Sequence, residues 1–103
     1  MPHLIIESSL PLSSKVVEEL HKEVGQQETV AIGSVRTRLY SPLMSFSDAE
    51  PGKEHTALTL KLLPGRSLQL KEQMASHLFN KASKLIKKGT VSVEIVDLGL
   101  YKK

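Results

Sequence analysis

The stretch LTLKLLPGRS, residues 58–67, decides how the rest of the chain is to be arranged. It ends an alternating apolar segment that is typical of a strand, turns at a Pro-Gly pair, and reaches Ser67, which can cap a helix. A similar junction, LPLSS at residues 10–14, lies 53 positions earlier and also joins a predicted strand to a predicted helix. These two junctions indicate an internal repeat, in which one strand–helix–strand unit occurs twice.

The two units are predicted to occupy about residues 2–40 and 54–98 of a single domain. The elements expected in the first are a strand at 3–8, a helix from Ser13 or Ser14 to Gly25, and a strand at 30–40. Those expected in the second are a strand at 55–63, a long helix from Ser67 to Gly89, and a strand at 90–98. Both helices show apolar side chains at helical spacing: Val16, Val17, Leu20 and Val24 in the first, and Leu70, Met74, Leu78, Ala82 and Leu85 in the second.

The order of these elements predicts the fold. Crossovers of this kind are right-handed and make the two strands of each unit parallel. Two units side by side predict an α+β fold, a four-stranded sheet with both helices on one face. We expect Ile5, with residues at or next to Leu58 and Val91, to make the other face apolar. A bare apolar face needs cover, so association of several copies is predicted.

The composition limits the classes of protein that the chain can be. With 103 residues and no tryptophan, it can bury only a modest aliphatic core. The absence of cysteine excludes disulfides and thiolate metal sites. No apolar stretch approaches the roughly 20 residues of a membrane span, and the first residues lack the features of a signal peptide. We therefore expect a cytoplasmic protein with no membrane partner.

The charged residues do not favour a nucleic-acid partner. The net charge is +3, from 14 basic and 11 acidic residues. Near the end of the long predicted helix lie four lysines, Lys81, Lys84, Lys87 and Lys88. No aromatic side chains interleave with them to stack on bases, so a solvated helix face is favoured over a nucleic-acid patch. The four histidines lack the i, i+4 spacing of a helical metal site, so no metal is expected.

Arginine is used sparingly, at three positions against eleven lysines. Arg36 and Arg38 share one face of the second predicted strand, and Arg66 lies in the turn before the long helix. An arginine fork binds a carboxylate through two hydrogen bonds, which lysine cannot do. The arginines can bind a carboxylate ligand or form salt bridges across the sheet, to Glu7, Glu94 or Asp97. The two roles are compatible, since one arginine can be structural while the others bind a ligand.

Pro2 directly precedes the first predicted strand. Proline is tolerated where a strand begins, which is a sufficient structural reason for it. The chemical alternative is that removal of Met1 leaves Pro2 with a free secondary amine, which can act as a base. If Met1 is retained, the same nitrogen is an amide without useful basicity.

Three motifs in order give the chain a family resemblance: MPH-x-I-x-E, then GSVRTR, then LTLKLLPGRS. The chain resembles the 5-carboxymethyl-2-hydroxymuconate isomerases of the tautomerase superfamily. The resemblance implies a trimer with active sites near subunit boundaries, Pro2 as catalytic base, and Arg36 and Arg66 as partners of substrate carboxylates. Arg38 matches the second arginine of a pair, and its role stays open. The resemblance implies neither a metal nor an organic cofactor.

The implied reaction is a proton transfer on a small unsaturated 2-hydroxy or 2-oxo acid, similar to 5-carboxymethyl-2-hydroxymuconate. Two alternatives remain, a phenylpyruvate-type keto–enol tautomerase and a non-catalytic trimeric binding module of the same fold. The loop at residues 41–53 lacks the tryptophans of other family members, and the tail after Leu98 is short. Both segments can wall the pocket, so the identity of the substrate stays open.

Overall fold

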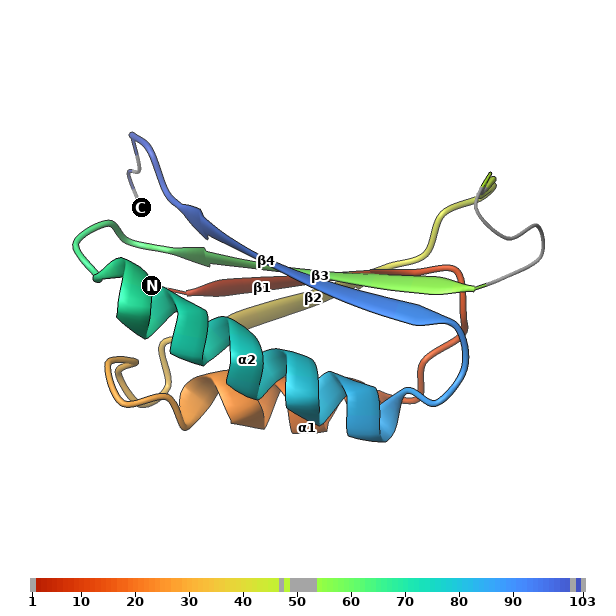
Figure 1. The fold of residues 1–103 in the computed structure, drawn as a ribbon, viewed down its shortest axis with the longest axis horizontal. Helices are drawn as coiled ribbons and strands as arrows, with labels where there is room; N and C mark the ends of the chain where they lie inside the picture. Colours follow the sequence, from red (N-terminus) through yellow and green to blue (C-terminus); the bar gives the residue numbers. More distant parts are fainter. Residues whose placement is uncertain (1, 47, 49–53, 101, 103) are drawn as a thin grey trace.

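The two strand–helix–strand units follow one another along the chain, as the internal repeat predicts (Figure 1). The computed structural model describes residues 2–46, 48, 54–100 and 102. The first unit comprises β1 (His3–Ser8), α1 (Ser14–Gly25) and β2 (Arg36–Tyr40). The second comprises β3 (His55–Leu62), α2 (Leu68–Leu85) and β4 (Thr90–Asp97). Neither helix in this described part of the chain combines the length and the hydrophobicity that a transmembrane segment requires.

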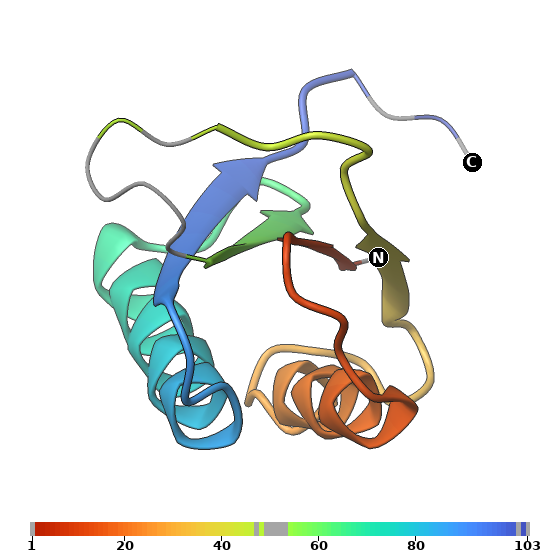
Figure 2. The same ribbon diagram turned by 90° about the vertical axis from the view of Figure 1, so that its right-hand side faces the viewer.

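The four strands form one mixed sheet in the order β2-β1-β3-β4. β1 runs parallel to β2 and β3 runs parallel to β4, while β1 and β3 pair antiparallel at the centre. Both helices pack on the same face of this sheet, and neither covers the opposite face (Figures 1 and 2). The predicted α+β fold, with two β-α-β repeats and both helices on one face, is therefore confirmed.

The core lies between the sheet and the two helices. Alternation along the central strands turns five side chains toward the helices, each at most 1% exposed: Leu4, Ile6, Leu58, Leu60 and Leu62. The predicted helical stripes meet them, and their most buried members, also at most 1% exposed, are Leu20, Val24, Met74, Leu78 and Ala82. Burial of this apolar surface, at about 25 cal/mol per Å², is the main force that holds the helices on the sheet.

The uncovered face of the sheet is more polar than the sequence predicts. The register turns Leu58 and Val91 toward the helices, and both contribute to the core. Ile5, Ala57 and Val96 do lie on the open face, but they lie among charged and hydroxyl side chains: Glu7, Arg36, Arg38, Thr59, Lys61, Ser92 and Glu94. Alternation shows which residues of a strand share a face, whereas pairing and packing decide which face meets the helices.

The second strand is shorter than predicted, because β2 begins at Arg36 rather than at residue 30. Val30 is instead a buried residue of the core, 8% exposed. A turn follows it, in which the Ser34 N–H donates to the Ala31 carbonyl and Gly33 has a φ of 75°. Glycine adopts this left-handed conformation without steric conflict. The apolar residues before Arg36 therefore form an anchor and a turn, although their composition is typical of a strand.

Both helices end differently from the prediction. Gly25 is the last residue of α1 rather than the residue after its end, and Gln26 caps the helix with right-handed backbone angles. α2 ends at Leu85, before Gly89, where Ile86 becomes extended and its side chain enters the core. The helix thus ends because the chain turns to bury the Ile86 side chain. Gly89 lies in the following turn, directly before β4.

Gly89 is a position where a side chain does not fit. It has a φ of 80°, and a Cβ there would overlap the Glu54 carbonyl oxygen, which accepts a hydrogen bond from the Thr90 N–H. Gly89→Ala is expected to lower the free energy of unfolding by about 2–4 kcal/mol, through a strained φ and a displaced backbone. Gly33→Ala isolates the strained φ, which is 75° with no atom near the added Cβ, and should cost only about 1 kcal/mol. Urea unfolding measures both values, and equal losses would contradict the close approach at Gly89.

Candidate active site

Pro2 enters the sheet at one end, beside the start of β2. It is buried, and its carbonyl oxygen accepts a hydrogen bond of 3.0 Å from the backbone N–H of Arg36. This bond continues the parallel β1–β2 ladder past the pair formed by His3 and Arg36. The predicted base and the first predicted arginine are therefore neighbours in the fold, although they are far apart in the sequence.

Arg36 and Arg38 lie on the same face of β2, as predicted, and this is the open face of the sheet. Between them, Thr37 points the other way, where its hydroxyl lies 2.6 Å from Nδ1 of His21 in α1. The Arg38 guanidinium donates from Nη1 to Nδ1 of His3 at 3.2 Å. Because Nδ1 accepts this bond, the proton of the neutral His3 ring is on Nε2.

A row of basic side chains crosses the open face next to Pro2. In this row His3 of β1 lies between Arg36 of β2 and Lys61 of β3. Burial is the largest cause of a lowered His3 pKa, and nearby positive charges, that of Arg38 first among them, lower the pKa further. This end of the sheet therefore favours anionic ligands. The sequence alone does not indicate His3 or Lys61 as site residues, because their proximity depends on the strand register.

Arg66 lies at the same end of the sheet, in the turn between β3 and α2. Because β3 runs antiparallel to β1, the end of β3 lies beside the start of β1, and Figure 1 shows this turn near the amino-terminal end of β1. The guanidinium donates from Nε to Oγ1 of Thr29 at 2.9 Å and from Nη2 to the Thr29 carbonyl at 3.0 Å. A third bond runs from Nη1 to the Leu63 carbonyl at 3.2 Å. Arg66 thereby joins its turn to the loop between α1 and β2.

Arg38 and Arg66 are held by hydrogen bonds to neutral groups, and not by the salt bridges that the sequence allows. Arg38 donates to an imidazole nitrogen, and Arg66 donates to hydroxyl and carbonyl oxygens. Asp97, one of the acidic residues considered, pairs with Lys71 at 3.2 Å. The structure thus brings the predicted site residues to one end of the sheet, and their binding of a carboxylate stays a prediction.

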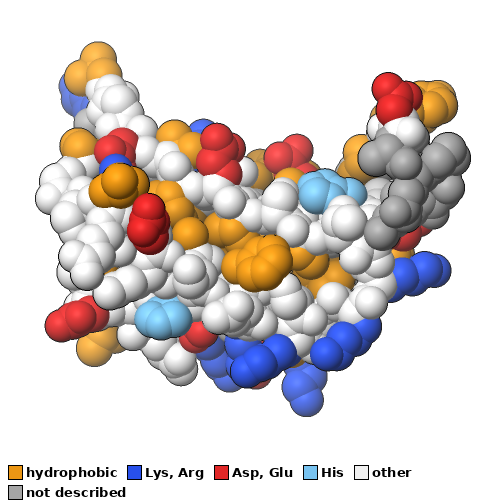
Figure 3. Space-filling view, in the orientation of Figure 1, with side chains coloured by type: hydrophobic (Ala, Val, Ile, Leu, Met, Phe, Trp, Pro, Cys, Tyr) orange, Lys and Arg blue, Asp and Glu red, His pale blue; other side chains and the backbone are white. Residues whose placement is uncertain are grey.

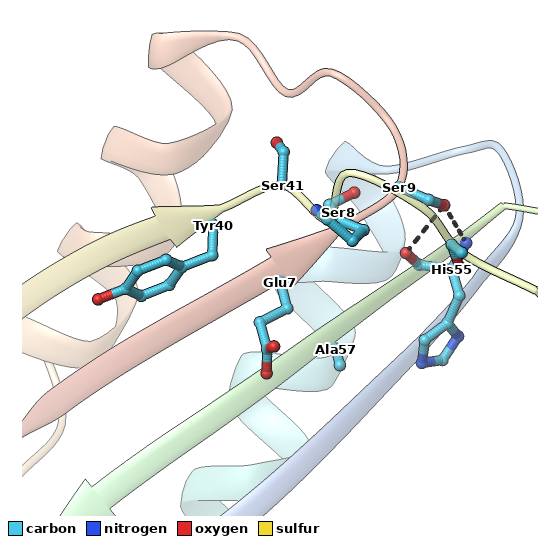
Figure 4. Close-up of a pocket in the computed structure, with 9 residues that line it drawn as sticks. Glu7, Ser8, Ser9, Tyr40, Ser41, His55 and Ala57 are labelled. Atoms are coloured by element: carbon cyan, nitrogen blue, oxygen red, sulfur yellow. Dashed lines mark hydrogen bonds between the residues drawn. The ribbon is translucent and has the colours of Figure 1, made fainter.

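A hollow of about 260 Å³ lies at the opposite end of the sheet (Figure 4). It forms where β1 and β2 end and β3 begins, and its lining consists of Glu7, Ser8, Ser9, Tyr40, Ser41, Pro42, Ser45, His55 and Ala57. The His55 ring is held by the hydroxyls of Thr90 and Ser92, at 2.5 Å and 3.2 Å. The Glu7 carboxylate repels anions, so this hollow does not suit the acids that the arginines indicate.

Two further predictions about the site concern a metal or cofactor and the loop at residues 41–53. Within the part of the chain that the structure describes, no group of three or more His, Asp and Glu side chains is arranged to hold a metal ion. The expectation that the reaction needs no metal or cofactor remains a prediction. Met1, and residues 47 and 49–53 of the loop that was expected to wall the pocket, lie outside the described residues.

The lowered pKa of His3 predicts a pH-dependent loss of stability. As the pH falls below the ordinary value of 6.5, the unfolded chain binds a proton that the folded chain binds only at lower pH. The contribution of His3 to stability is therefore complete above pH 6.5 and is lost as the pH falls through the lowered folded pKa. His3→Asn keeps an acceptor for Arg38 but does not titrate, so its melting temperature should fall less than that of the unsubstituted chain between about pH 7.5 and 5. Circular dichroism melts measure this, and identical pH profiles would contradict the lowered pKa.

The family model described as 5-carboxymethyl-2-hydroxymuconate isomerase matches residues 2–99. No curated protein sequence matches the chain. A solved 5-carboxymethyl-2-hydroxymuconate isomerase from Deinococcus radiodurans R1 is 24% identical, with 99% of this chain and 88% of that chain covered and a TM-score of 0.83. A solved 5-carboxymethyl-2-hydroxymuconate delta-isomerase is 18% identical, with 100% and 87% covered and a TM-score of 0.85. A fused 4-OT wild-type symmetric trimer is 17% identical, with 94% and 87% covered and a TM-score of 0.76.

These comparisons agree with the motifs on which the resemblance was based. The solved structures share the fold of this chain, at identities too low to carry more than the fold. The family match carries the assignment, because it spans nearly the whole sequence and includes Pro2 and all three arginines. The chain belongs to the 5-carboxymethyl-2-hydroxymuconate isomerase family and is thereby assigned to the isomerase enzymes, as its motifs predict.

Proposed function

We propose that this chain is a cofactor-independent isomerase that moves a proton on a small unsaturated 2-hydroxy or 2-oxo acid, with Pro2 as the base. The proposed substrates are acids similar to 5-carboxymethyl-2-hydroxymuconate, the compound in the family's description. The observation that carries the proposal is the contact between Pro2 and Arg36, whose backbone groups lie 3.0 Å apart. A candidate base and a candidate carboxylate-binding cation are thus neighbours at the basic end of the sheet.

The Pro2 nitrogen becomes a secondary amine once Met1 is removed. Free α-amino groups titrate at about 7.7–8.0, and burial or a nearby positive charge lowers this pKa, because both disfavour the protonated form. Pro2 is buried beside Arg36, and the adjacent His3 has a lowered pKa in the same surroundings. These features support an amine that is unprotonated near neutral pH, as a general base must be.

Two guanidinium groups suit a substrate with more than one carboxylate, and 5-carboxymethyl-2-hydroxymuconate has three. Each guanidinium can bind one carboxylate through a pair of N–H donors. In this proposal Arg36 and Arg66 each hold one carboxylate of the substrate, while Arg38, bonded to His3, adds positive charge nearby. The same cations stabilise the negative charge that develops on the substrate when it loses a proton.

The proposed reaction moves one proton within the substrate and leaves its composition unchanged. The Pro2 nitrogen takes the proton of the 2-hydroxyl group, and the C2–O bond becomes a carbonyl. The electron pair moves along the conjugated chain, and the resulting ammonium group returns a proton to a carbon further along it. The balance needs no oxidant, reductant or second substrate.

The two alternative functions differ from this one in what the protein would turn over. Phenylpyruvate has a single carboxylate and would engage a single guanidinium, so the two arginines of the candidate site favour an acid with more than one carboxylate. A non-catalytic binding module of the same fold would turn over neither acid. A panel that contains both acids therefore separates the three functions.

The chemical state of the Pro2 nitrogen gives the direct test. Two preparations are compared, one that lacks Met1 by intact mass and one in which an added N-terminal residue keeps this nitrogen as an amide. The capped chain is expected to lose about 10²–10⁴-fold in kcat/KM on 5-carboxymethyl-2-hydroxymuconate, because its nitrogen cannot take a proton. Pro2→Ala keeps a primary amine and is expected to fall between the two. Circular dichroism controls for folding, and equal rates from the capped and uncapped chains would falsify the proline base.

Self-association as a homotrimer is part of the proposal, and one solved neighbour is described as a symmetric trimer. The segment after β2 carries apolar side chains with no cover: Leu43, Met44 and Phe46 are 104%, 76% and 91% exposed. A further hydrophobic area lies over α2 and the edge strand β4, where Phe79 and Val93 line a shallow groove (Figure 3). Exposed apolar areas of this kind support association of copies.

Sedimentation equilibrium tests the trimer. At low micromolar concentration the expected mass is that of three chains. Phe46→Glu places a charge on the exposed apolar segment and is expected to shift the population toward the monomer. Lys15→Glu, at an exposed position of α1, which belongs to neither apolar area, serves as the control and should leave the mass unchanged. An unsubstituted chain that sediments as a monomer would contradict the trimer while leaving the proline base open to its own test.

A further inference from the structure

Thr29 holds one edge of the Arg66 guanidinium with two different oxygen atoms. Its hydroxyl Oγ1 accepts from Nε at 2.9 Å, and its carbonyl oxygen accepts from Nη2 at 3.0 Å. These two nitrogens form one edge of the planar group, so the two bonds fix the orientation of the plane as well as its position. The Leu63 carbonyl accepts the third bond, from Nη1 at 3.2 Å.

This arrangement leaves donors for a ligand on another edge of Arg66. The guanidinium has five N–H donors, and its bonds to Thr29 and Leu63 use three of them. Nη1 and Nη2 carry two hydrogens each, and in the described contacts each uses one. One N–H therefore remains on each terminal nitrogen, and these two nitrogens form a second edge of the same fork. A carboxylate binds such an edge through two parallel hydrogen bonds.

The loop that carries Thr29 is itself anchored on both sides. Val30, the next residue, is buried in the core, and its N–H donates to the Gln27 carbonyl at 3.1 Å. The Gln27 side chain donates to the Glu23 carbonyl in α1 at 3.0 Å and lies 3.2 Å from Nδ1 of His77 in α2. Because Thr29 lies between these anchors, contacts with both helices set the place of its oxygen atoms.

We infer that Thr29 is a positioning residue, which holds Arg66 with one edge of its guanidinium ready for a substrate carboxylate. The inference rests on the proposed function, in which Arg66 binds substrate. A long side chain that is already ordered loses less conformational entropy when the acid arrives, so the acid binds more tightly. Thr29 itself does not touch the reacting atoms, so it acts on substrate affinity and not on the proton transfer.

A matched pair of variants tests this role. Thr29→Val keeps the shape of threonine but lacks the hydroxyl, whereas Thr29→Ser keeps the hydroxyl. Thr29→Val is expected to raise KM for 5-carboxymethyl-2-hydroxymuconate about tenfold with kcat unchanged, because a hydrogen bond to a charged group is lost. Thr29→Ser should restore the KM of the unsubstituted chain. In an Arg66→Lys background Thr29→Val should add no further increase, since the bond that it removes is already absent.

Binding of adipate, a saturated diacid that cannot ketonise, gives a second measurement that does not depend on turnover. The Nε–H signal of Arg66 is followed by ¹H–¹⁵N NMR and identified by its loss in Arg66→Lys. Adipate is expected to shift this signal in the unsubstituted chain and in Thr29→Ser. Its Kd should be about tenfold weaker in Thr29→Val. The unfolding temperature of each variant shows whether the fold is intact.

The two proposals fail in different ways. If capping of Pro2 has no effect on rate but Thr29→Val weakens adipate binding, the proline base is wrong and the positioning role of Thr29 stands. If turnover depends on Pro2 but Thr29→Val changes neither KM nor the adipate Kd, the positioning role is overturned. A variant that only melts at a lower temperature overturns it as well, since Thr29 then merely stabilises its loop.

Discussion

The antiparallel pairing of β1 with β3 is the constraint on which the rest of the structure depends. It joins the two β-α-β units into one sheet, with His3 opposite Lys61. Because the two strands run in opposite directions, the start of β1 lies beside the end of β3, and the end of β1 lies beside the start of β3. Pro2, just before β1, therefore lies at the same end as the turn after β3, which carries Arg66. A parallel arrangement of the two units would separate them by the length of a strand.

The same pairing makes the two ends of the sheet chemically different. At one end the strands bring together cationic side chains around His3, and the lowered His3 pKa reflects their combined field as well as burial. A neutral amine and a bound acid are both favoured by such a field, because it disfavours a further proton and attracts an anion. At the other end, Glu7 and His55 line a hollow in which the Glu7 carboxylate repels anions. The two repeats share one architecture, but the two ends of the sheet differ chemically because they carry different side chains.

Much of the architecture was predictable because it depends on local patterns. Helical stripes, serine caps and a Pro-Gly turn identified both units, and strand alternation placed Arg36 and Arg38 on one face. The chain has three arginines and eleven lysines, and this sparing use of arginine indicates a specific role for Arg66. The importance of Pro2 came from the resemblance, since strand propensity alone accounts for a proline at that position. Local patterns were less reliable at segment ends, where burial of one side chain can end a helix or replace a strand, as at Val30.

The sequence by itself therefore determined the two repeats, their order and the residue types available for chemistry, because periodicity and capping act between residues that are close along the chain. Only the tertiary structure decided that Leu58 faces the helices, that Lys61 lies beside His3, and that Thr29 accepts two hydrogen bonds from Arg66. These facts depend on strand register and on contacts between loops, which join residues distant in sequence. Such contacts form only when the whole sheet and both helices pack together, so no local pattern encodes them.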